Sequence, residues 1–412
     1  NLSYHYDIFV GQYCSVNTTN NMSDLKIPNL EDLLQLDEKI AFTKIKCLTA
    51  PGENYGSLML SVDVTTESNH ELKVVAKTLP PNPKMQEMFD SPVTFRNEIA
   101  FYKTIIPTLR SFQKKHGVKK VMNFAAKYYG SRPNLHHKDD KIDQDAVLLL
   151  ENLKVSGFVN VERTEGFDLD TSKLILRDLA QLHGIGIALK LQEPKIFNQK
   201  VRPYLTPLTL PEEAHDDWKD KYLKIIHSIP RLEPYLERLK KVNFDMKGPP
   251  PPREPFASIS HNDCWVNNAM VKFENGKAVE SRLVDFQISA YASPAKDVLF
   301  FLFSSLRNDV LRKNCDGLIR YYHENLIGVL KELKCDTKPF CFEEFKKELD
   351  FEAKHTQFVD TVLMLIPIFA PKLKVKDWAE IEPTDIGNNE PTELHMEKLV
   401  VIVEEYAKRG WI

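Results

Sequence analysis

Apolar positions between residues 37 and 150 alternate or form short runs, which predicts the strands of an antiparallel sheet. Leu, Leu, Val and Val alternate with other residues over 58–64, as in a strand with one buried face. Residues 72–78 are rich in β-branched side chains, and residues 146–153 form a continuous apolar run typical of a buried strand. Over 92–109 the apolar spacing of three and four predicts a helix packed on this sheet.

From residue 151 onward the apolar spacing is mainly helical. A helix is predicted over 171–190, capped by Asp170 or Thr171, and more helices are predicted within 205–245 and 318–408. We therefore predict an α+β chain with two lobes. It divides into an N-terminal extension, an N-lobe with a small antiparallel sheet and a larger, mainly helical C-lobe, at residues 1–36, 37–150 and 151–412.

Two polar residues of the helical part are given structural roles. His183 lies within an apolar helical stripe and is interpreted as a packing or core-polar residue. Asp297 begins a strongly apolar helix, so we expect it to cap that helix or to brace the loop before it.

Two polar segments are predicted to meet across a hairpin. Residues 260–270 are rich in polar groups, and Asp285 ends an apolar run further along the chain. Asn275-Gly276 lies between the two, and this dipeptide flanked by apolar residues is typical of a two-residue hairpin turn. The hairpin would place Asn268 beside Asp285, with Asp263 nearby. Phosphoryl transfer requires such a set, because oxygen ligands hold Mg²⁺ and a carboxylate accepts the proton of the attacking hydroxyl.

Features of the N-lobe would complete a nucleotide site. Lys77 lies near the end of a predicted strand and would reach the phosphates. Lys73 is on the same face of this strand but nearer its exposed start, so we prefer Lys77. Glu98 lies beside the apolar stripe of the predicted helix. Alone, each could be an ordinary surface residue. A turn that could cover the phosphates with backbone N–H groups contains Gly52, Asn54, Tyr55, Gly56 and Ser57.

The paired motif carries a resemblance to a known family. His-x-Asp-x-x-x-x-Asn followed by Asp-Phe-Gln resembles phosphotransferases with a protein-kinase-like fold, such as aminoglycoside phosphotransferases and choline kinases. Two sequence segments are most similar to the arthropod ecdysteroid kinase-like family: His-Asn-Asp-Cys-Trp-Val-Asn-Asn-Ala-Met and Leu-Val-Asp-Phe-Gln. The resemblance extends from about Glu38 to the C-terminus. Asn262 stands where this family usually has Gly, which leaves the ligand residues in place but changes the turn.

The resemblance implies an ATP- and Mg²⁺-dependent kinase. Asp263 would be the base for the acceptor hydroxyl, and His261 would brace the catalytic loop by hydrogen bonding rather than move protons. Asn268 and Asp285 would hold Mg²⁺, while Lys77, held by Glu98, anchors the phosphates. The edge of adenine would meet the C=O of Glu151 and the N–H of Leu153.

The acceptor is predicted to be a small molecule. The segment from Asp285 to Asp297 is too short for the loop on which protein kinases dock peptides. We expect an apolar hydroxylated acceptor, such as an ecdysteroid or another steroid or xenobiotic alcohol. A choline- or aminoglycoside-type kinase, or a catalytically silent ligand-binding protein, remains an alternative. Expected walls of the acceptor pocket are Trp218, Phe358, Met364, Leu365 and Phe369.

Composition narrows the class of protein without identifying the acceptor. The chain has 412 residues and a net charge of −3, so no overall basic field points to nucleic acid. No apolar run is long enough for a membrane span. The 6 cysteines lack zinc-ligand spacing and indicate reduced thiols in a cytoplasmic protein. We expect a monomer.

Overall fold

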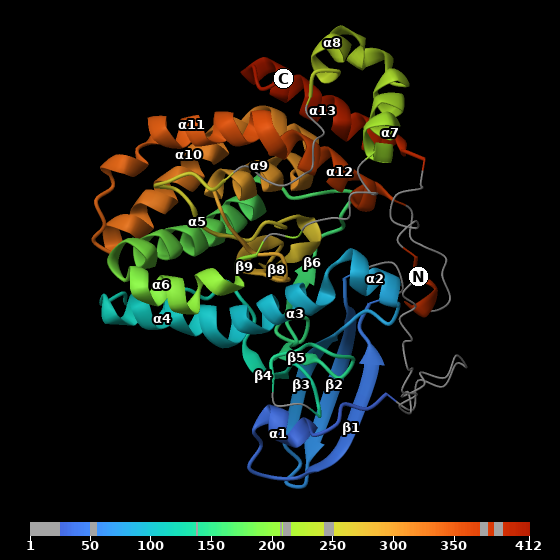
Figure 1. Cartoon of the computed structure of the whole chain (residues 1–412), viewed down its shortest axis with the longest axis vertical. Helices are drawn as coiled ribbons and strands as arrows, with labels where there is room; N and C mark the ends of the chain where they lie inside the picture. Colours follow the sequence, from blue (N-terminus) through green and yellow to red (C-terminus); the bar gives the residue numbers. More distant parts are fainter. Residues whose placement is uncertain are drawn as a thin grey trace, which may run out of the picture.

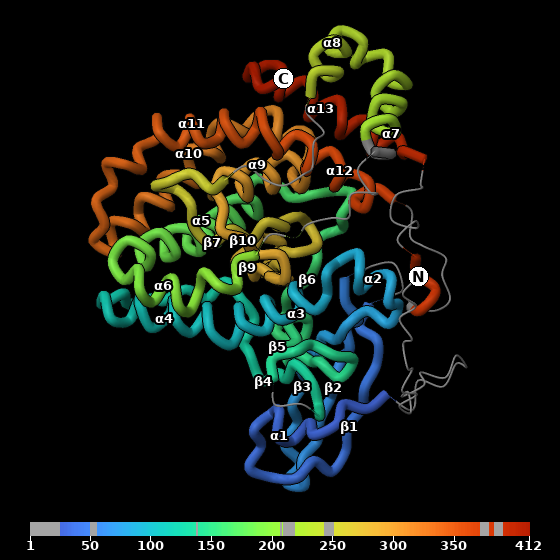
Figure 2. The backbone as a smooth tube through the Cα atoms, in the orientation of Figure 1, coloured from blue at the N-terminus to red at the C-terminus, as the bar shows by residue number. Residues whose placement is uncertain are grey.

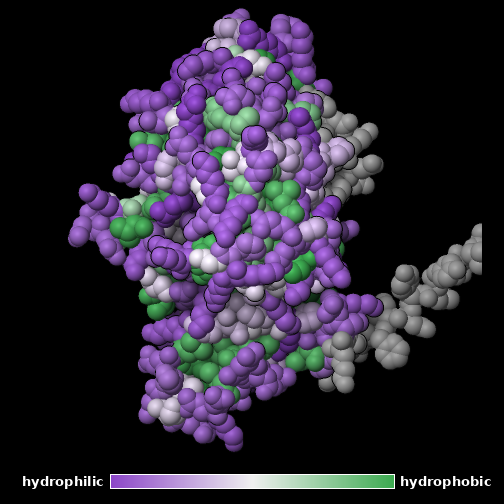
Figure 3. Space-filling model, turned by 90° about the vertical axis from the view of Figure 1, so that its left-hand side faces the viewer, coloured by the Kyte–Doolittle hydropathy of each residue, from purple (hydrophilic) through white to green (hydrophobic). Residues whose placement is uncertain are grey.

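A computed structural model describes most of the chain, and none of the described helices is long and apolar enough to cross a membrane. On the face shown in Figure 3 the surface is mainly hydrophilic, and hydrophobic residues gather in small areas, one of them over the sheet at the bottom. The described residues are 25–49, 56–136, 139–206, 208, 216–242, 251–370, 378–382 and 390–412.

The N-lobe is built on the predicted antiparallel sheet. Its five strands lie in the order β1-β2-β3-β5-β4, with every pair antiparallel (Figure 1). The run expected to be a buried strand is β5, which lies between β3 and β4 and has its first four residues buried. The strands are β1 (Ile40–Cys47), β2 (Leu58–Thr66), β3 (Glu71–Thr78), β4 (Tyr128–Arg132) and β5 (Val147–Glu151).

The two faces of this sheet are buried against different elements. On one face, Val74 and Ala76 of β3 pack in a cluster with Leu30 and Leu34 of the short helix α1 (Leu30–Leu34). Residues alternate between faces along a strand, so Lys77 points to the opposite face. That face is covered by the helices that follow, and Lys77 is therefore directed into the interior.

A long helical segment covers this second face, as predicted. It consists of α3 (Ser91–Ala100), a π-helical stretch (Phe101–Ile105) and α4 (Ile106–Lys115), preceded by α2 (Pro83–Met88). Pro107 has no backbone N–H to donate to the previous turn, and the π-helical stretch directly before α4 widens the helix at this place. In Figure 1 this segment lies between the sheet and the C-terminal helices.

Two small sheets carry the segments expected to meet across a hairpin. In the first, β8 (Ala269–Glu274) pairs with β9 (Lys277–Leu283) and with β6 (Phe158–Asn160). Asn275 and Gly276 have φ of 50° and 76°, as a two-residue hairpin turn requires. The predicted hairpin is confirmed. In the second sheet, β7 (Ser258–Ser260) pairs with β10 (Ala290–Ala292) and brackets the loop that follows β7.

Helices form the rest of the C-lobe. The cap of α5 is Asp168, whose carboxylate accepts the Thr171 N–H at 2.8 Å, not Asp170 or Thr171 as expected. Similarly, Ser293 caps α9 in place of Asp297. The helices are α5 (Leu169–Gln192), α6 (Pro194–Lys200), α7 (Asp216–His227), α8 (Leu236–Leu239), α9 (Pro294–Ser305), α10 (Asn308–Glu332), α11 (Phe342–Glu352), α12 (Phe358–Phe369) and α13 (Glu393–Arg409).

The two-lobed α+β architecture is confirmed. Figure 2 shows the chain leaving the sheet after β5 and passing through β6 into α5. The proposed boundaries at residues 36 and 150 stay predictions. The packing of α1 on the sheet nevertheless ties residues 30–34 to the N-lobe.

Candidate active site

Lys77 lies at the centre of a buried ion-pair cluster that joins the lobes. Its side chain is 3% exposed, and its Nζ lies 2.6 Å from Glu98 Oε2 and 2.8 Å from Asp285 Oδ1. Burial by itself would lower the pKa of Lys77, but the carboxylates of Asp285 and Glu98 outweigh it and raise this pKa above its usual range. The ammonium group therefore stays charged at neutral pH. Lys73 is exposed and lies 3.9 Å from Glu71, so the choice of Lys77 agrees with the geometry.

Glu98 contacts both lobes. One carboxylate oxygen pairs with Lys77, and the other, Oε1, accepts the backbone N–H of Phe286 at 3.2 Å. The ring of Phe286 stacks on Phe101 at the end of α3, with ring centroids 4.0 Å apart. Glu98 therefore fixes the backbone directly after Asp285 as well as the lysine. A lysine on the third strand paired with a glutamate on the following helix is the arrangement of protein-kinase-like folds, which confirms the expected fold.

The loop after β7 brings Asp263 and Asn268 together. Asn268 Nδ2 donates to the backbone oxygen of Asp263 at 2.9 Å and to its Oδ2 at 2.8 Å. The N–H of Val284 donates to the Asn268 carbonyl at 3.0 Å, which places Asp285 beside the loop. Burial and the nearby charge of Asp285 raise the pKa of Asp263 well above its usual range. The three oxygen-bearing side chains thus occupy one region, together with Lys77.

Two residues of this region have left-handed backbone conformations. Both Asn262 and Asp285 have φ of 64°. Asn and Asp adopt this conformation more readily than other non-glycine residues, since their short polar side chains can hydrogen-bond locally. This accounts for Asn262 at a position that the resembling family usually fills with Gly.

Asp297 on α9 holds the start of the loop after β7 by accepting hydrogen bonds from its backbone. Its Oδ2 accepts the His261 N–H at 2.6 Å and its Oδ1 accepts the Asn262 N–H at 2.8 Å. His183 Nε2 lies 2.8 Å from Asp297 Oδ2, and its Nδ1 lies 2.7 Å from the hydroxyl of Tyr322. Burial alone would raise the pKa of Asp297, but the hydrogen bond and charge of His183 lower it. The expected bracing role of Asp297 is thus seen, and His183 has the core-polar role that was one of its two interpretations. The contribution of Tyr322 was missed, because an apolar helical stripe gives no sign of it.

His261 has the geometry of a bracing residue. Its Nε2 lies 3.0 Å from the carbonyl oxygen of Val284, and its ring packs on Phe286. Burial lowers the pKa of His261, so the ring is neutral and its Nε2–H donates to that carbonyl. The side chain links the loop to the strand that leads to Asp285.

The described part of the glycine-containing turn lies against the segment after Asp285. Gly56 approaches the side chain of Gln287 so closely that a Cβ would lie 2.9 Å from Nε2. Ser57 is buried beside Met59, with Oγ 3.9 Å from the sulfur. A residue larger than glycine at 56 would displace Gln287. The other predicted members of the turn, Gly52, Asn54 and Tyr55, lie outside the described residues.

Glu151 and Leu153 lie where the sheet ends and the C-lobe begins. The Glu151 carboxylate accepts the Lys127 N–H at 3.1 Å and the Ser156 hydroxyl at 2.6 Å. Leu153 is buried, and its carbonyl oxygen accepts the Phe158 N–H at 2.9 Å. Their backbone contacts to adenine stay predictions.

The residues expected to hold Mg²⁺ fit a site completed by a nucleotide. The described residues include no group of three or more His, Cys, Asp or Glu side chains that could hold a metal by themselves. Mg²⁺ in kinase-type sites needs only one or two protein carboxylates, because phosphates and water supply the other ligands. Asp285 is 18% exposed, and Asn268 uses its Nδ2 on Asp263, which leaves its amide oxygen as a ligand. Asn268 and Asp285 are suited to such a partial site.

The expected apolar walls of the acceptor pocket lie largely in the core. Leu365 is fully buried, and Phe358 packs edge-to-face on Tyr406 with ring centroids 5.0 Å apart. Met364 is half-buried, and the side chain of Trp218 lies outside the described residues. An apolar acceptor pocket at this place stays a prediction.

Comparisons with known proteins agree with the geometry. A model of the ecdysteroid kinase-like family matches residues 51–335, more than half of the chain and inclusive of Lys77, Asp263 and Asp285. A choline kinase from Cryptosporidium parvum is 10% identical, with 94% of each chain covered and a TM-score of 0.43. An ethanolamine kinase from Plasmodium vivax is 11% identical, with 90% of this chain and 84% of that chain covered and a TM-score of 0.39. A GDP complex of an aminoglycoside 2'-phosphotransferase is 14% identical, with 74% of this chain and 90% of that chain covered and a TM-score of 0.36. No curated protein matches the chain.

Proposed function

The chain belongs to the ecdysteroid kinase-like family, and we propose that it transfers the γ-phosphoryl group of ATP to a hydroxyl of a small molecule. One observation carries the proposal: Lys77 and Glu98 from the N-lobe meet Asp285 from the C-lobe in a single buried cluster. The transition state of phosphoryl transfer is highly charged, so catalysis is mostly positioning and charge neutralisation. A fixed ammonium group beside oxygen ligands serves both needs.

Each residue of the cluster has a distinct part in this proposal. Lys77 anchors the phosphates that are not transferred, and Glu98 keeps its ammonium group in place. Asn268 and Asp285 would hold Mg²⁺, which when bound neutralises charge on the β- and γ-phosphates. Because Lys77 already contacts Asp285 at 2.8 Å, the phosphate-binding and metal-binding groups are adjacent before any ligand enters.

Asp263 is the proposed base. Asn268 Nδ2 engages Oδ2 of this carboxylate at 2.8 Å, which orients the side chain and leaves Oδ1 for the proton of the acceptor hydroxyl. Burial raises the pKa of Asp263, and a carboxylate with a raised pKa is a stronger base. The brace from Asp297 to the loop backbone keeps Asp263 in position.

We propose an apolar hydroxylated acceptor, of the ecdysteroid, steroid or xenobiotic alcohol type. The family supports this class, and the segment after Asp285 supports a small molecule. It contains only β10 before α9 begins at Pro294, so it leaves no long loop on which a peptide could dock.

One observation favours a cationic amino-alcohol acceptor instead. Carboxyl groups of Glu348, Glu352 and Asp360 lie near the start of α9 and outnumber their two cations, Lys296 and Arg253, the latter 3.4 Å from Glu348. Burial raises the pKa of Glu352 to about 7 although Lys296 opposes it. A cationic acceptor would relieve this excess of buried carboxyl groups, as expected for a choline- or aminoglycoside-type kinase.

Turnover of ATP by the purified chain, measured with an ecdysteroid, choline and an aminoglycoside as acceptors, tests the proposal. We expect stimulation by one class and a loss of about 10²–10⁴-fold in kcat for Asp263→Ala, the usual contribution of general base catalysis. Binding of Mg·ATP, measured by calorimetry, should persist in this variant. Lost nucleotide affinity with intact turnover would contradict the role of Asp263. Acceptors that bind without stimulating turnover would indicate a silent binding protein.

A further inference from the structure

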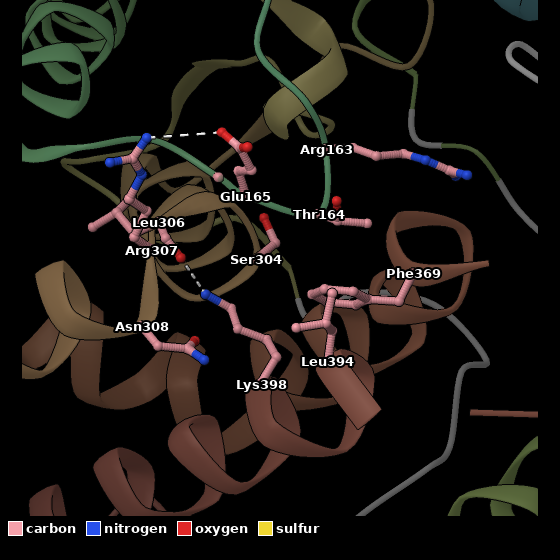
Figure 4. A pocket seen from close by; sticks show the side chains of 11 residues that line it. Arg163, Thr164, Glu165, Ser304, Leu306, Arg307, Asn308, Phe369, Leu394 and Lys398 are labelled. Atoms are coloured by element: carbon pink, nitrogen blue, oxygen red, sulfur yellow. Dashed lines mark hydrogen bonds and ion pairs between the residues drawn. The ribbon is translucent and has the colours of Figure 1, made fainter. Parts of the chain in front are cut away.

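A pocket with no assigned role lies beyond the far end of α9. It has a volume of about 60 Å³ and lies between the connection after β6, the junction of α9 and α10, and α13 (Figure 4). Ser304 lines the pocket, whereas Asp297 on the same helix braces the catalytic loop. The two residues are separated by about 10 Å along the helix axis at 1.5 Å per residue. The pocket shares Phe369 with the expected walls of the acceptor pocket, but it contains none of the residues assigned to the nucleotide, the metal or the base.

A buried lysine, Lys398, lines the pocket. Lys398 is 3% exposed, and its Nζ donates to the carbonyl oxygen of Leu306 at 2.5 Å. No carboxylate among the described residues lies within ion-pair distance of it. Burial lowers the pKa of Lys398 to about 7. A buried ammonium group without a counter-charge is unfavourable, and an anion in the pocket would supply that charge.

Groups around Lys398 favour an oxyanion. Arg307 is half exposed and only weakly paired with Glu165, at 3.9 Å. It precedes the first residue of the long helix α10, whose N-terminus has no side-chain cap, so positive helix-dipole charge faces the same place. The hydroxyl groups of Thr164 and Ser304 add possible hydrogen-bond donors. All of these charges and donors attract oxygen atoms with negative charge.

Another arginine supports the wall of the pocket instead of its interior. Arg163 donates to the carbonyl oxygen of Ala370 at 2.6 Å and to that of Pro367, at the end of α12. In Figure 4 its guanidinium points away from Lys398. The same figure shows Phe369 and Leu394 next to each other on one side of the pocket. A ligand held by its oxyanion would place the rest of its body on these apolar side chains.

We propose that this pocket binds a small oxyanion with an apolar body, with Lys398 and Arg307 as its cations and Phe369 and Leu394 as its apolar contacts. The binding does not require phosphoryl transfer. Its test is therefore independent of the proposed kinase activity.

Calorimetric titrations with inorganic sulfate and with phenyl sulfate test the proposal. Sulfate carries a constant charge near neutral pH, and the phenyl ester adds the apolar body. A charge-assisted hydrogen bond contributes roughly 10- to 100-fold in affinity, so we expect such a loss for Lys398→Met and a smaller one for Arg307→Gln. Lys408→Met, an exposed lysine on the same helix, is the matched control and should bind both ligands as the wild type does. Phenyl sulfate should bind more tightly than sulfate.

Sulfate can also enter the nucleotide site, so the titrations are repeated with Lys77→Met. Binding that persists in Lys77→Met and is lost in Lys398→Met belongs to the pocket. Equal affinity in the wild type and Lys398→Met, or no binding by Lys77→Met that circular dichroism shows to be folded, would overturn the proposal. Equal affinity for sulfate and phenyl sulfate would overturn the proposed apolar contacts with Phe369 and Leu394. Arg307 is a surface side chain, so its variant keeps the test valid should Lys398→Met fail to fold.

Proton uptake gives a second readout. Bound sulfate favours the charged form of Lys398, so the wild type should take up protons at pH 7.5, measured from the heat in buffers of different ionisation enthalpy. The other ionisable side chains of the pocket are Arg163, Glu165 and Arg307, and His395 lies one turn earlier on α13. Burial lowers the pKa of His395 to about 4, so it is neutral at this pH. Binding without proton uptake would contradict the lowered pKa of Lys398 and would show that its ammonium group is charged before the anion enters.

Discussion

Lys77 and Lys398 are buried to the same extent and surrounded in opposite ways. Each is 3% exposed. Lys77 lies between two carboxylates, at 2.6 Å and 2.8 Å, whereas Lys398 has a carbonyl oxygen at 2.5 Å. Burial lowers the pKa of both groups, but only at Lys77 do neighbouring charges reverse the effect. The partners of a buried lysine, and not its depth, decide whether it remains charged.

This difference matches two kinds of anion binding. The charge of Lys77 is fixed in advance by Glu98 and Asp285, which suits its proposed role of anchoring phosphates in every catalytic cycle. The charge of Lys398 depends on pH and on whatever occupies the pocket. The first site is preorganised, and the second responds to its ligand.

The same substitution at both lysines should have opposite effects on stability. Lys77→Met leaves Glu98 and Asp285 close together without their cation, so we expect it to lower the free energy of unfolding by about 3–5 kcal/mol, the usual cost of breaking a buried pair. Lys398→Met replaces an unpaired buried ammonium group by a flexible apolar side chain and should be neutral or stabilising. Urea unfolding at pH 7 measures both, with Lys408→Met as the exposed control. Similar losses at positions 77 and 398 would contradict the comparison.

Stability should rise with pH because of Lys398. In the unfolded chain a lysine has a pKa of about 10.4, and in the folded protein burial lowers that of Lys398 to about 7. Between these values the unfolded state binds more protons, so the free energy of unfolding increases with pH. The slope approaches ~1.4 kcal/mol per pH unit, and we expect a gain of ~1–2 kcal/mol from pH 7 to 8.5 in urea unfolding. Lys77 adds nothing here, since it stays protonated in both states.

Variants and ligands can separate this contribution from other titrating groups. Lys398→Met should lose this part of the slope, and Lys408→Met should keep it. Saturating sulfate should flatten the slope in the wild type, because a bound anion stabilises the charged lysine. A slope that is unchanged in Lys398→Met would show that other groups cause it.

Local patterns were sufficient to predict which segments meet at the candidate site. The turn at Asn275-Gly276 depends on two adjacent residues, and it alone brings Asn268 beside Asp285. Lys77 and Lys73 lie on the same face, and the preference for Lys77 followed from its depth along the strand. The helical stripe placed Glu98 on a helix, and the resemblance to kinase-like folds supplied its pairing with Lys77. Each inference spans only a few turns or one hairpin.

Such local patterns could not predict contacts between elements that are distant in the sequence. Asp297, His183 and Tyr322 come from three helices, and only their packing creates the chain of hydrogen bonds below the loop. Lys398 likewise resembles a surface lysine of an amphipathic helix until Leu306 is placed beside it. Phe358 and Leu365 were expected to face an acceptor, since apolar residues of a core and of a pocket look alike in sequence.

The smallest expected effect concerns the turn that carries the loop to the Lys77 cluster. Asn262 has φ of 64°, a conformation that glycine adopts freely and a β-branched residue strongly resists. Asn262→Gly keeps the N–H that donates to Asp297 at 2.8 Å, and relief of backbone strain is offset by the greater entropy of the unfolded glycine. We expect a change within ~0.5 kcal/mol in urea unfolding and nearly unchanged ATP turnover. Asn262→Val should lose about 1–2 kcal/mol from the same left-handed strain. Should both variants unfold alike, the turn would not hold the loop in place, and the first lysine would be less preorganised than its ion pairs indicate.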